Sequence, residues 1–477
     1  MKAMSALLHG ALYAVVLSSL LGCAADRGIT RHDAGQPPEP VATAPSERVS
    51  RSGSNATVMP PQADRTTRAA DDIRPPDGSP VAIRAALGRL PTPQEGLPRA
   101  VLKVDYLAIA DAAASRPPLN IAIVIDHSGS MAEQRKLAYA LEASRWVVEN
   151  MTERDVLSII AFNDRVTVLA PAGRVVNKAF LLHRLEELSP SGYTDLSAGL
   201  LEGIAQIDSQ QADEQVRQVL LLTDGLANRG VTDSASLRAI SEKAFAKGIS
   251  VSTFGIGTDF NERLLAEMAS AGAGRYAYIR SAEQIPVAFK EEVRGLLQVV
   301  AQNAVVQITI NNGNIVKVYG QGLEQPLRSY RVPIGNLRAA EQGFLLMEVA
   351  TESAPDGEVS LTVDDPRAGG RVTQRVSLPS LAAPGGAEQS EDVLAYREIV
   401  GALERAELAL RAFDAQGYRD ARTAFDQTYA RMHQRAVQSR DQELLNQTFV
   451  LRHFMDELAA IGQRGLLHDH RDARERL

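Results

Sequence analysis

The 477-residue chain contains a single cysteine, few aromatic residues and no excess of basic residues. One cysteine excludes an intramolecular disulfide framework and any zinc or iron–sulfur site built from several thiolates. Aromatic residues make up 5% of the chain and hydrophobic residues 45%, so the cores are expected to consist mainly of leucine, valine, isoleucine and alanine. The formal net charge of −7 argues against a nucleic-acid-binding protein, which would show a basic patch.

The cysteine ends an apolar segment at the beginning of the chain. Within residues 1–22, Lys2 precedes a mostly apolar run from Ala6 to Gly22 that is too short for a comfortable membrane-spanning helix, so residues 1–22 are typical of a signal peptide. The sequence Leu20-Leu21-Gly22-Cys23 resembles a bacterial lipobox, which implies cleavage before Cys23 and lipidation of that residue. Ala24 follows, and a residue other than aspartate at that position favours the outer over the inner membrane. We therefore expect a lipid-anchored, extracytoplasmic protein of the bacterial cell envelope.

The segment after Cys23 has the composition of an unfolded tether. Residues 24–98 contain no Phe, Trp or Tyr and hold 12 of the 23 prolines. Such a segment cannot bury enough apolar surface to offset the entropy lost on ordering. We therefore predict a lipidated N-terminus and a disordered, proline-rich tether over residues 23–98, within which the apolar spacing of Pro80–Leu90 would allow one short helix.

Residues 119–298 alternate apolar strands with helical patterns. Asn120–Asp126, Asp155–Phe162 and Val216–Asp224 are nearly continuous apolar runs, as expected for parallel strands that are buried on both faces. Helical periodicity separates them, first over Ala132–Asn150. The alternation predicts an α/β fold with a doubly wound, mostly parallel sheet flanked by helices. Ligands of such sheets bind at the carboxyl ends of the strands.

Two further folded parts are predicted after the α/β region. Residues 299–382 contain short strands separated by turn residues, which is the pattern of a β-sandwich. A strand within residues 99–118 is expected to join this β-rich domain, so that the α/β domain would be an insertion. Residues 389–465 have apolar side chains at helical spacing and predict a helical C-terminal domain.

Oxygen-bearing side chains gather at the predicted carboxyl edge of the parallel sheet. The first strand runs into Asp126-His127-Ser128-Gly129-Ser130, Thr194 precedes a helix, and Asp224 ends another buried strand. Hard divalent cations prefer oxygen ligands, so this set favours Mg²⁺. Ca²⁺ or Mn²⁺ remain alternatives, because selectivity among these ions depends on the geometry of the site.

Because of these residues, the region 119–298 resembles the von Willebrand factor type A (VWA) family and its metal-ion-dependent adhesion site. All five motif positions are matched, by Asp126, Ser128, Ser130, Thr194 and Asp224. The resemblance implies that the three hydroxyls bind the ion directly or through one water. It also implies that the two aspartates act mostly through water or by hydrogen-bonding the hydroxyls, and that an Asp or Glu carboxylate of a protein partner completes the coordination.

The same residues fit a binding module better than an enzyme. A phosphotransferase that used Asp126 would want a second acid nearby, but residue 128 is serine, and the Gly-x-Ser-x-Gly elbow of a serine hydrolase is missing around it. No Gly-x-Gly-x-x-Gly motif opens the first helix, so a dinucleotide is not expected. We predict a membrane-anchored binding protein, not an enzyme, without nucleic-acid or small-molecule partners. The alternative is a structural or assembly lipoprotein of the envelope whose β-rich and helical regions form the interface.

Overall fold

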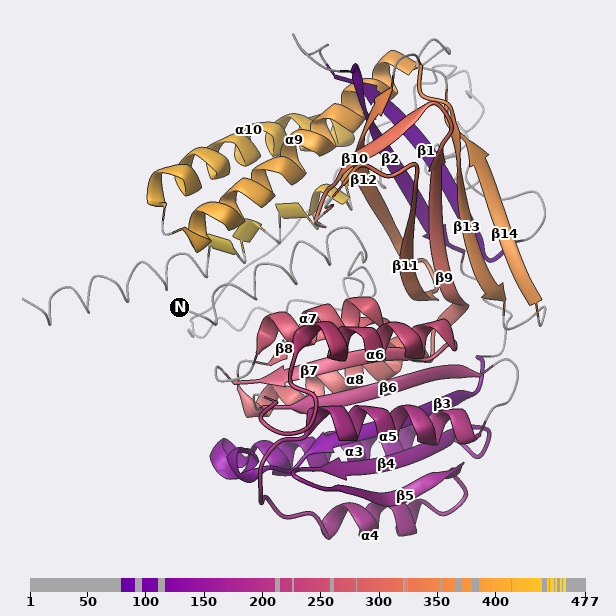
Figure 1. Cartoon of the computed structure of the whole chain (residues 1–477), viewed down its shortest axis with the longest axis vertical. Helices are drawn as coiled ribbons and strands as arrows, with labels where there is room; N and C mark the ends of the chain where they lie inside the picture. Colours follow the sequence, from indigo (N-terminus) through magenta and orange to yellow (C-terminus); the bar gives the residue numbers. More distant parts are fainter. Residues whose placement is uncertain are drawn as a thin grey trace, which may run out of the picture.

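The computed structural model describes residues 79–90, 97–109, 116–210, 215–224, 227–257, 261–279, 281–320, 323, 325–351, 354–365, 370–379, 386–412, 414–439 and parts of 444–459. The predicted signal peptide, Cys23 and the tether up to residue 78 lie outside these residues. Figure 1 shows an α/β domain joined to a β-sandwich, with long helices lying against the sandwich. Among the helices in the described ranges, none is both long and apolar enough to cross a membrane.

The α/β domain is built on a six-stranded sheet. Its strands are β3 (Leu119–Asp126), β4 (Val156–Phe162), β5 (Val166–Arg174), β6 (Val216–Thr223), β7 (Ser250–Ile256) and β8 (Ala273–Ile279). They lie in the order β5-β4-β3-β6-β7-β8, and every neighbouring pair is parallel except β4 with β5 at one edge. The mostly parallel sheet predicted from the sequence is therefore confirmed.

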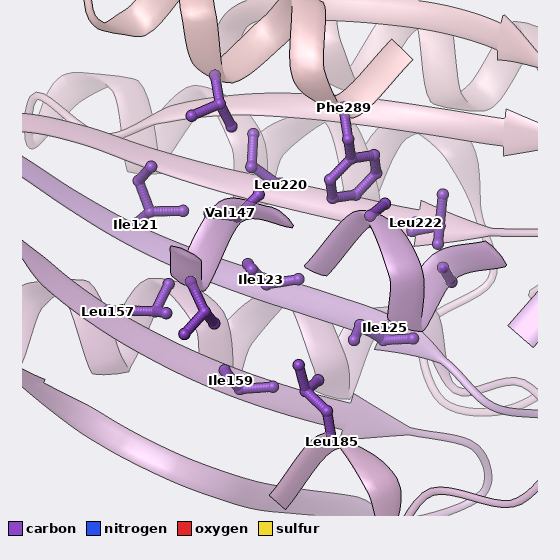
Figure 2. Packing of buried hydrophobic residues seen from close by; sticks show 14 of the residues in the cluster. Ile121, Ile123, Ile125, Val147, Leu157, Ile159, Leu185, Leu220, Leu222 and Phe289 are labelled. Atoms are coloured by element: carbon purple, nitrogen blue, oxygen red, sulfur yellow. The ribbon is translucent and has the colours of Figure 1, made fainter. Parts of the chain in front are cut away.

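Helices cover both faces of this sheet and bury its apolar side chains. They are α3 (Lys136–Asn150), α4 (Lys178–Glu186), α5 (Leu196–Ser209), α6 (Ser234–Ala246), α7 (Glu262–Ala271) and α8 (Ile285–Leu296), with the short 3₁₀ helices η1 (Gly129–Arg135) and η2 (Ala282–Gln284). Figure 2 shows one face, where Ile123 of β3 packs with Val147 of α3 and Phe289 of α8. Val124 points to the other face and packs with residues of α5, α6 and α7. Alternate residues of one strand thus serve two cores.

The β-rich region is a sandwich of two four-stranded antiparallel sheets. One has the order β1 (Val81–Arg89), β2 (Arg99–Ala108), β12 (Gln342–Thr351) and β10 (Gly313–Val318). The other has the order β11 (Ser329–Arg338), β9 (Val299–Ile310), β13 (Gly357–Asp365) and β14 (Gly370–Ser377). Because β2 pairs with β12, residues 99–108 belong to this sandwich, and the α/β domain is inserted between β2 and β9.

The predicted tether is wrong for residues 79–90, which belong to the folded sandwich. Val81–Arg89 form β1, which pairs with β2 from Val81 opposite Ala108 to Arg89 opposite Ala100. The residues also do not form the short helix that their spacing allowed. Val81, Ala85 and Leu87 are buried on the inner face, because alternate residues of a strand point the same way. Pairing with β2 stabilises this strand, and the composition of the flanking segment concealed it.

The C-terminal helices pack against the sandwich and do not form a separate domain. Helix α9 (Gly386–Arg411) lies beside α10 (Ala415–Ser439) on the outer face of the sheet that contains β2 and β12 (Figure 1). Phe344 of β12 and Tyr396 of α9 have ring centroids 5.2 Å apart. The helices expected at 389–465 are thus present in the described residues, but they share a core with the sheet. The reason is that this sheet carries apolar side chains on both faces.

Candidate metal centre

Asp126 ends β3 at the carboxyl edge of the sheet, and its side chain is fully buried. Its Oδ1 accepts the backbone N–H of Ser128 at 2.8 Å, and its Oδ2 accepts the hydroxyl of Thr223 at 2.6 Å. Burial raises the pKa of Asp126 to about 6, although the hydrogen bonds from Thr223 and Ser128 oppose that rise. A cation placed beside this carboxylate would favour its ionised form.

Two serine hydroxyls and a second carboxylate meet next to Asp126. The Oγ of Ser128 lies 3.3 Å from the Oγ of Ser130, and Ser130 donates to Oδ1 of Asp224 at 2.7 Å. Ser128 and Asp224 are each only 2% exposed. No group of three His, Cys, Asp or Glu residues stands ready to hold a metal in the described part of the chain. The donor set combines serine hydroxyls with carboxylates, and oxygen donors of this kind fit a small, hard cation such as Mg²⁺.

Thr194 lies beside this cluster in the loop that precedes α5. The carbonyl of Gly192 accepts the N–H of Gly129 at 3.2 Å, which joins this loop to the one that carries the serines. Thr194 is 3% exposed. Its N–H donates to the side chain of Asn228 at 3.0 Å, and its carbonyl accepts the N–H groups of Asn228 and Arg229 at 3.2 Å. The structure thus brings all five predicted residues to the same edge of the sheet.

Two residues that border the cluster have roles within the loops. Asp195, which follows Thr194 in the chain, is the N-cap of α5. Its Oδ1 accepts the N–H of Ala198 at 3.0 Å and the hydroxyl of Ser197 at 2.7 Å. His127 is a loop residue whose Nδ1 lies 2.9 Å from the carbonyl oxygen of Ser189. Both residues therefore stabilise the loops that carry the candidate oxygen ligands.

Sequence reasoning missed Lys136, the first residue of α3. Its Nζ donates to Oδ2 of Asp224 at 2.6 Å, and its side chain is 9% exposed. The sequence does place Lys136 close to the site, because it comes only six residues after Ser130, at the start of the first helix after the loop of residues 126–130. Charge alone did not single it out, since lysines at the start of a helix usually point into solvent.

An aromatic and a cationic side chain form the outer rim of the cluster. Tyr193 precedes Thr194 and is 57% exposed. The guanidinium of Arg229, also exposed, lies 4.6 Å from the centroid of the Tyr193 ring. Because the backbone of Arg229 is bonded to Thr194, this pair keeps a fixed place beside the candidate ligands.

Residues 120–291 match the family model of the von Willebrand factor type A domain. The chain contains a VWA domain. Domains of this family generally mediate interactions between proteins, and most family members are adhesion or interaction proteins without enzymatic activity. The match covers nearly all of the predicted α/β region, and the described fold agrees with it.

The VWA domain has relatives among bacterial and human proteins. The chain is 27% identical to "Uncharacterized protein YfbK" of Escherichia coli (strain K12) over 277 residues, and this match covers 57% of this chain and 48% of that protein. It is 26% identical over 344 residues to "Uncharacterized protein sll0103" of Synechocystis, covering 66% and 80%. It is 27% identical over 243 residues to human "Inter-alpha-trypsin inhibitor heavy chain H3", covering 46% and 27%. The matches thus span about half of the first relative and about a quarter of the human one.

Two solved structures share the arrangement beyond the VWA domain. "Von Willebrand factor type A from Catenulispora acidiphila" has a TM-score of 0.54 at 18% identity, covering 76% of this chain and 88% of that one. The ArnB paralog VWA2 from Sulfolobus acidocaldarius has a TM-score of 0.51 at 15% identity, covering 80% and 98%. At these identities the likeness shows the fold alone. The aligned part of this chain is longer than residues 120–291, so the likeness extends beyond the VWA domain.

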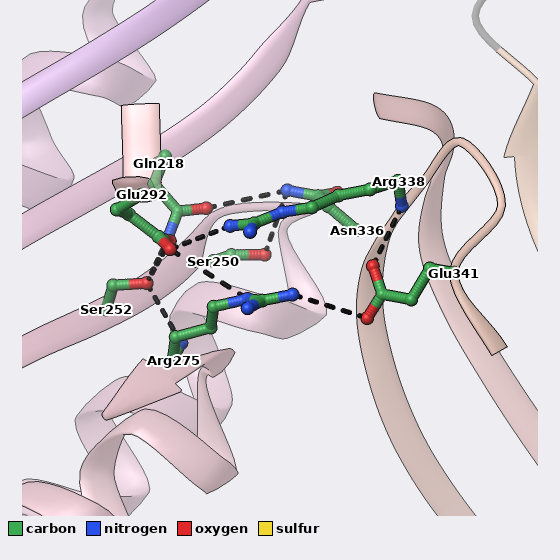
Figure 3. Close-up of polar contacts among 8 residues, drawn as sticks. All are labelled: Gln218, Ser250, Ser252, Arg275, Glu292, Asn336, Arg338 and Glu341. Atoms are coloured by element: carbon green, nitrogen blue, oxygen red, sulfur yellow. Dashed lines mark hydrogen bonds and ion pairs between the residues drawn. The ribbon is translucent and has the colours of Figure 1, made fainter. Parts of the chain in front are cut away.

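A buried polar network joins the VWA domain to the sandwich (Figure 3). Glu292 of α8 accepts hydrogen bonds from Arg338 of β11 and from the hydroxyl of Ser252, both at 2.8 Å, and Nε of Arg275 lies 3.8 Å from its carboxylate. Glu341 accepts from Arg275 at 3.4 Å and from the N–H of Arg338 at 3.0 Å. Burial alone would raise the pKa of Glu292, but the two guanidiniums and the Ser252 hydroxyl hold it below its ordinary value.

Proposed function

We propose that the protein binds a protein partner through a divalent cation, Mg²⁺ in the first instance, that is held at the carboxyl edge of the VWA domain. The residues that would hold the ion are Asp126, Ser128, Ser130, Thr194 and Asp224. The observation that carries the proposal is the convergence of two serine hydroxyls with two buried aspartates within hydrogen-bonding distances. The bound ion would supply an electrophilic centre for an Asp or Glu carboxylate of the partner.

The rim of the site supports a protein as the ligand. Tyr193 and Arg229 are exposed and stacked beside Thr194. Tyrosine and arginine are enriched among the residues that contribute most to protein–protein binding, because they combine large apolar contact area with hydrogen-bonding groups. A partner that places its carboxylate at the ion would lay neighbouring residues on this pair.

We also propose that the protein is anchored to the membrane through Cys23 after removal of residues 1–22. The support is the sequence Leu20-Leu21-Gly22-Cys23 together with the proline-rich composition that follows. Several acyl chains on one residue would hold a protein stably at a bilayer, whereas one chain binds marginally. The proposed location is the bacterial cell envelope, on the outer membrane in preference to the inner one.

A second candidate function is an assembly role in which the sandwich and helices form the interface. The observation in its favour is a set of apolar side chains exposed on the C-terminal helical region: Leu408 at 62%, Val437 at 55% and Phe449 at 66%. Exposed apolar groups of this kind are common at interaction surfaces when they are contiguous. This candidate requires no metal, so metal removal separates it from the first.

The two candidates are separated by replacing the serines of the metal loop. We expect the unmutated protein to bind Mg²⁺ in a calorimetric titration and to retain a partner from an envelope extract in Mg²⁺ but not in EDTA. Ser128→Ala with Ser130→Ala should lose both properties while keeping the circular dichroism spectrum of the fold. Ser209→Ala, at an exposed serine that ends α5, is the matched control and should lose neither.

The outcome that would contradict the metal-dependent function is a double variant that retains the partner as well as the unmutated protein does. The assembly role predicts that outcome. It further predicts that Phe449→Ser weakens capture whether or not EDTA is present.

A further inference from the structure

Lys136 places a fixed positive charge on a carboxylate of the candidate metal centre. Its Nζ donates to Oδ2 of Asp224 at 2.6 Å, while Ser130 donates to the other carboxylate oxygen at 2.7 Å. The side chains of Lys136 and Asp224 are 9% and 0% exposed. A pair this well buried is screened little by salt, so its charge acts strongly on anything that enters the site.

The backbone before Lys136 adopts an unusual conformation. Gln134 and Arg135 both have left-handed dihedral angles, with φ of 50° and 59°. Two consecutive residues with side chains rarely take this conformation, because Cβ then approaches the neighbouring carbonyl oxygen. The turn ends η1 and starts α3 at Lys136. Strain of this kind persists where the surrounding structure holds it, and it is concentrated at functional sites.

The charged groups around Lys136 make Asp224 its main partner. Among the residues that the structure describes, Glu133 also forms an ion pair with Lys136, with Oε2 at 3.9 Å from Nζ, but its side chain is 70% exposed. Solvent screens such a contact, whereas the contact with Asp224 is sheltered. A Cβ added to Gly257, the residue that follows β7, would lie 3.9 Å from the end of the lysine side chain, so the backbone after β7 also lies close to Lys136.

We propose that Lys136 sets the charge of the loaded site so that it favours an anionic partner at the expense of metal affinity. This inference rests on the proposed function of the same site. Asp126 and Asp224 together carry two negative charges, which a divalent cation neutralises, and Lys136 then leaves the loaded site with one positive charge. A partner carboxylate brings that total to zero. Before loading, the same lysine competes with the cation for Asp224.

The test replaces the charge and keeps the length of the side chain. Lys136→Met should bind Mg²⁺ at least about tenfold more tightly than the unmutated full-length protein in a calorimetric titration. A unit charge a few ångströms away repels the cation by more than the energy of a tenfold change in affinity, even through an effective dielectric constant of about 20. Lys136→Arg keeps the charge and should stay near the unmutated affinity. Lys136→Gln serves if the methionine variant does not fold, as judged by circular dichroism. Unchanged or weaker Mg²⁺ binding by the neutral variant overturns the inference.

A second measurement uses acetate as the carboxylate probe. By linkage, acetate at matched ionic strength should strengthen Mg²⁺ binding by the unmutated protein, and by a smaller factor in Lys136→Met. Equal factors in the two proteins overturn the inference. If the unmutated protein binds no Mg²⁺, the proposed function fails as well, whereas Mg²⁺ binding that is insensitive to residue 136 rejects only the role of the lysine.

Discussion

Replacing Arg338 tests whether the network in Figure 3 stabilises the junction between the VWA domain and the sandwich. Arg338→Met removes the guanidinium that donates to Glu292 at 2.8 Å and leaves a carboxylate whose side chain is 6% exposed. Breaking a buried ion pair from one side typically destabilises a protein by about 3–5 kcal/mol. Because Arg275 remains at 3.8 Å and Ser252 still donates, we expect the lower end of that range, about 3 kcal/mol.

The pH dependence of this loss follows from the sign of the Glu292 shift. The folded pKa of Glu292 lies below its ordinary value, so its contribution to stability is present above the unfolded pKa and is lost as the pH falls through the folded pKa. Arg338→Met removes a group that lowers this pKa. The destabilisation should therefore be complete near neutral pH and should shrink in acid, where the carboxyl group is protonated in both proteins.

Urea unfolding measures this prediction. Fluorescence of Trp146, the single tryptophan of the sequence, follows the VWA domain, and far-ultraviolet circular dichroism follows all helices. The matched control is Arg371→Met, which removes an exposed pair with Asp364 whose side chains are 72% and 38% exposed. The control should change the free energy of unfolding by about 0.5 kcal/mol or less. Equal stability of the two variants at neutral pH would refute the reasoning.

Two further predictions concern Asp126 and the packing of the junction. In EDTA near neutral pH, Asp126→Asn should raise the free energy of unfolding by up to about 3 kcal/mol, because ionising a carboxyl group whose folded pKa is raised to about 6 opposes folding. In urea unfolding, this gain should decrease as the pH falls from 6 towards the unfolded pKa. The same substitution should abolish Mg²⁺ binding. Gly335→Ala should lower the free energy of unfolding by about 2 kcal/mol or more and expose the junction to proteolysis, since φ is 92° and a Cβ would lie 2.1 Å from the carbonyl oxygen of Ala273. Gly173→Ala is the control and should change the free energy of unfolding little, because the nearest atom to an added Cβ is 3.8 Å away.

The parallel sheet and the positions of its site residues could be predicted because each depends on local pattern. All residues of β3 are buried, so an uninterrupted apolar run identifies the strand, and the rule that ligands bind at carboxyl ends then gathers Asp126 and Asp224 at one edge. Thr194 followed for the same reason, since it precedes a helix between two such strands. The predicted strand order thus places these residues close together although they are far apart in the sequence.

The missed features depend on partners that are distant in the chain or on unusual backbone geometry. β1 is an edge strand of mixed spacing inside a proline-rich region, and only its pairing with β2 decides its conformation. The apolar face of α9 was recognisable, but the sheet it packs on could not be identified from its own residues. Lys136 follows the left-handed turn at Gln134 and Arg135, and this conformation could not be predicted because neither residue is a glycine.

The insertion of the VWA domain between β2 and β9 has a mechanical consequence. A partner that pulls on the carboxyl edge of the domain would load two covalent connections at once, one from β2 to β3 and one from α8 to β9. β2 and β9 lie in different sheets, and each is an interior strand with a hydrogen-bonded neighbour on both sides. Tension would therefore be divided between the sheets, and extracting either strand would require breaking two ladders of hydrogen bonds together.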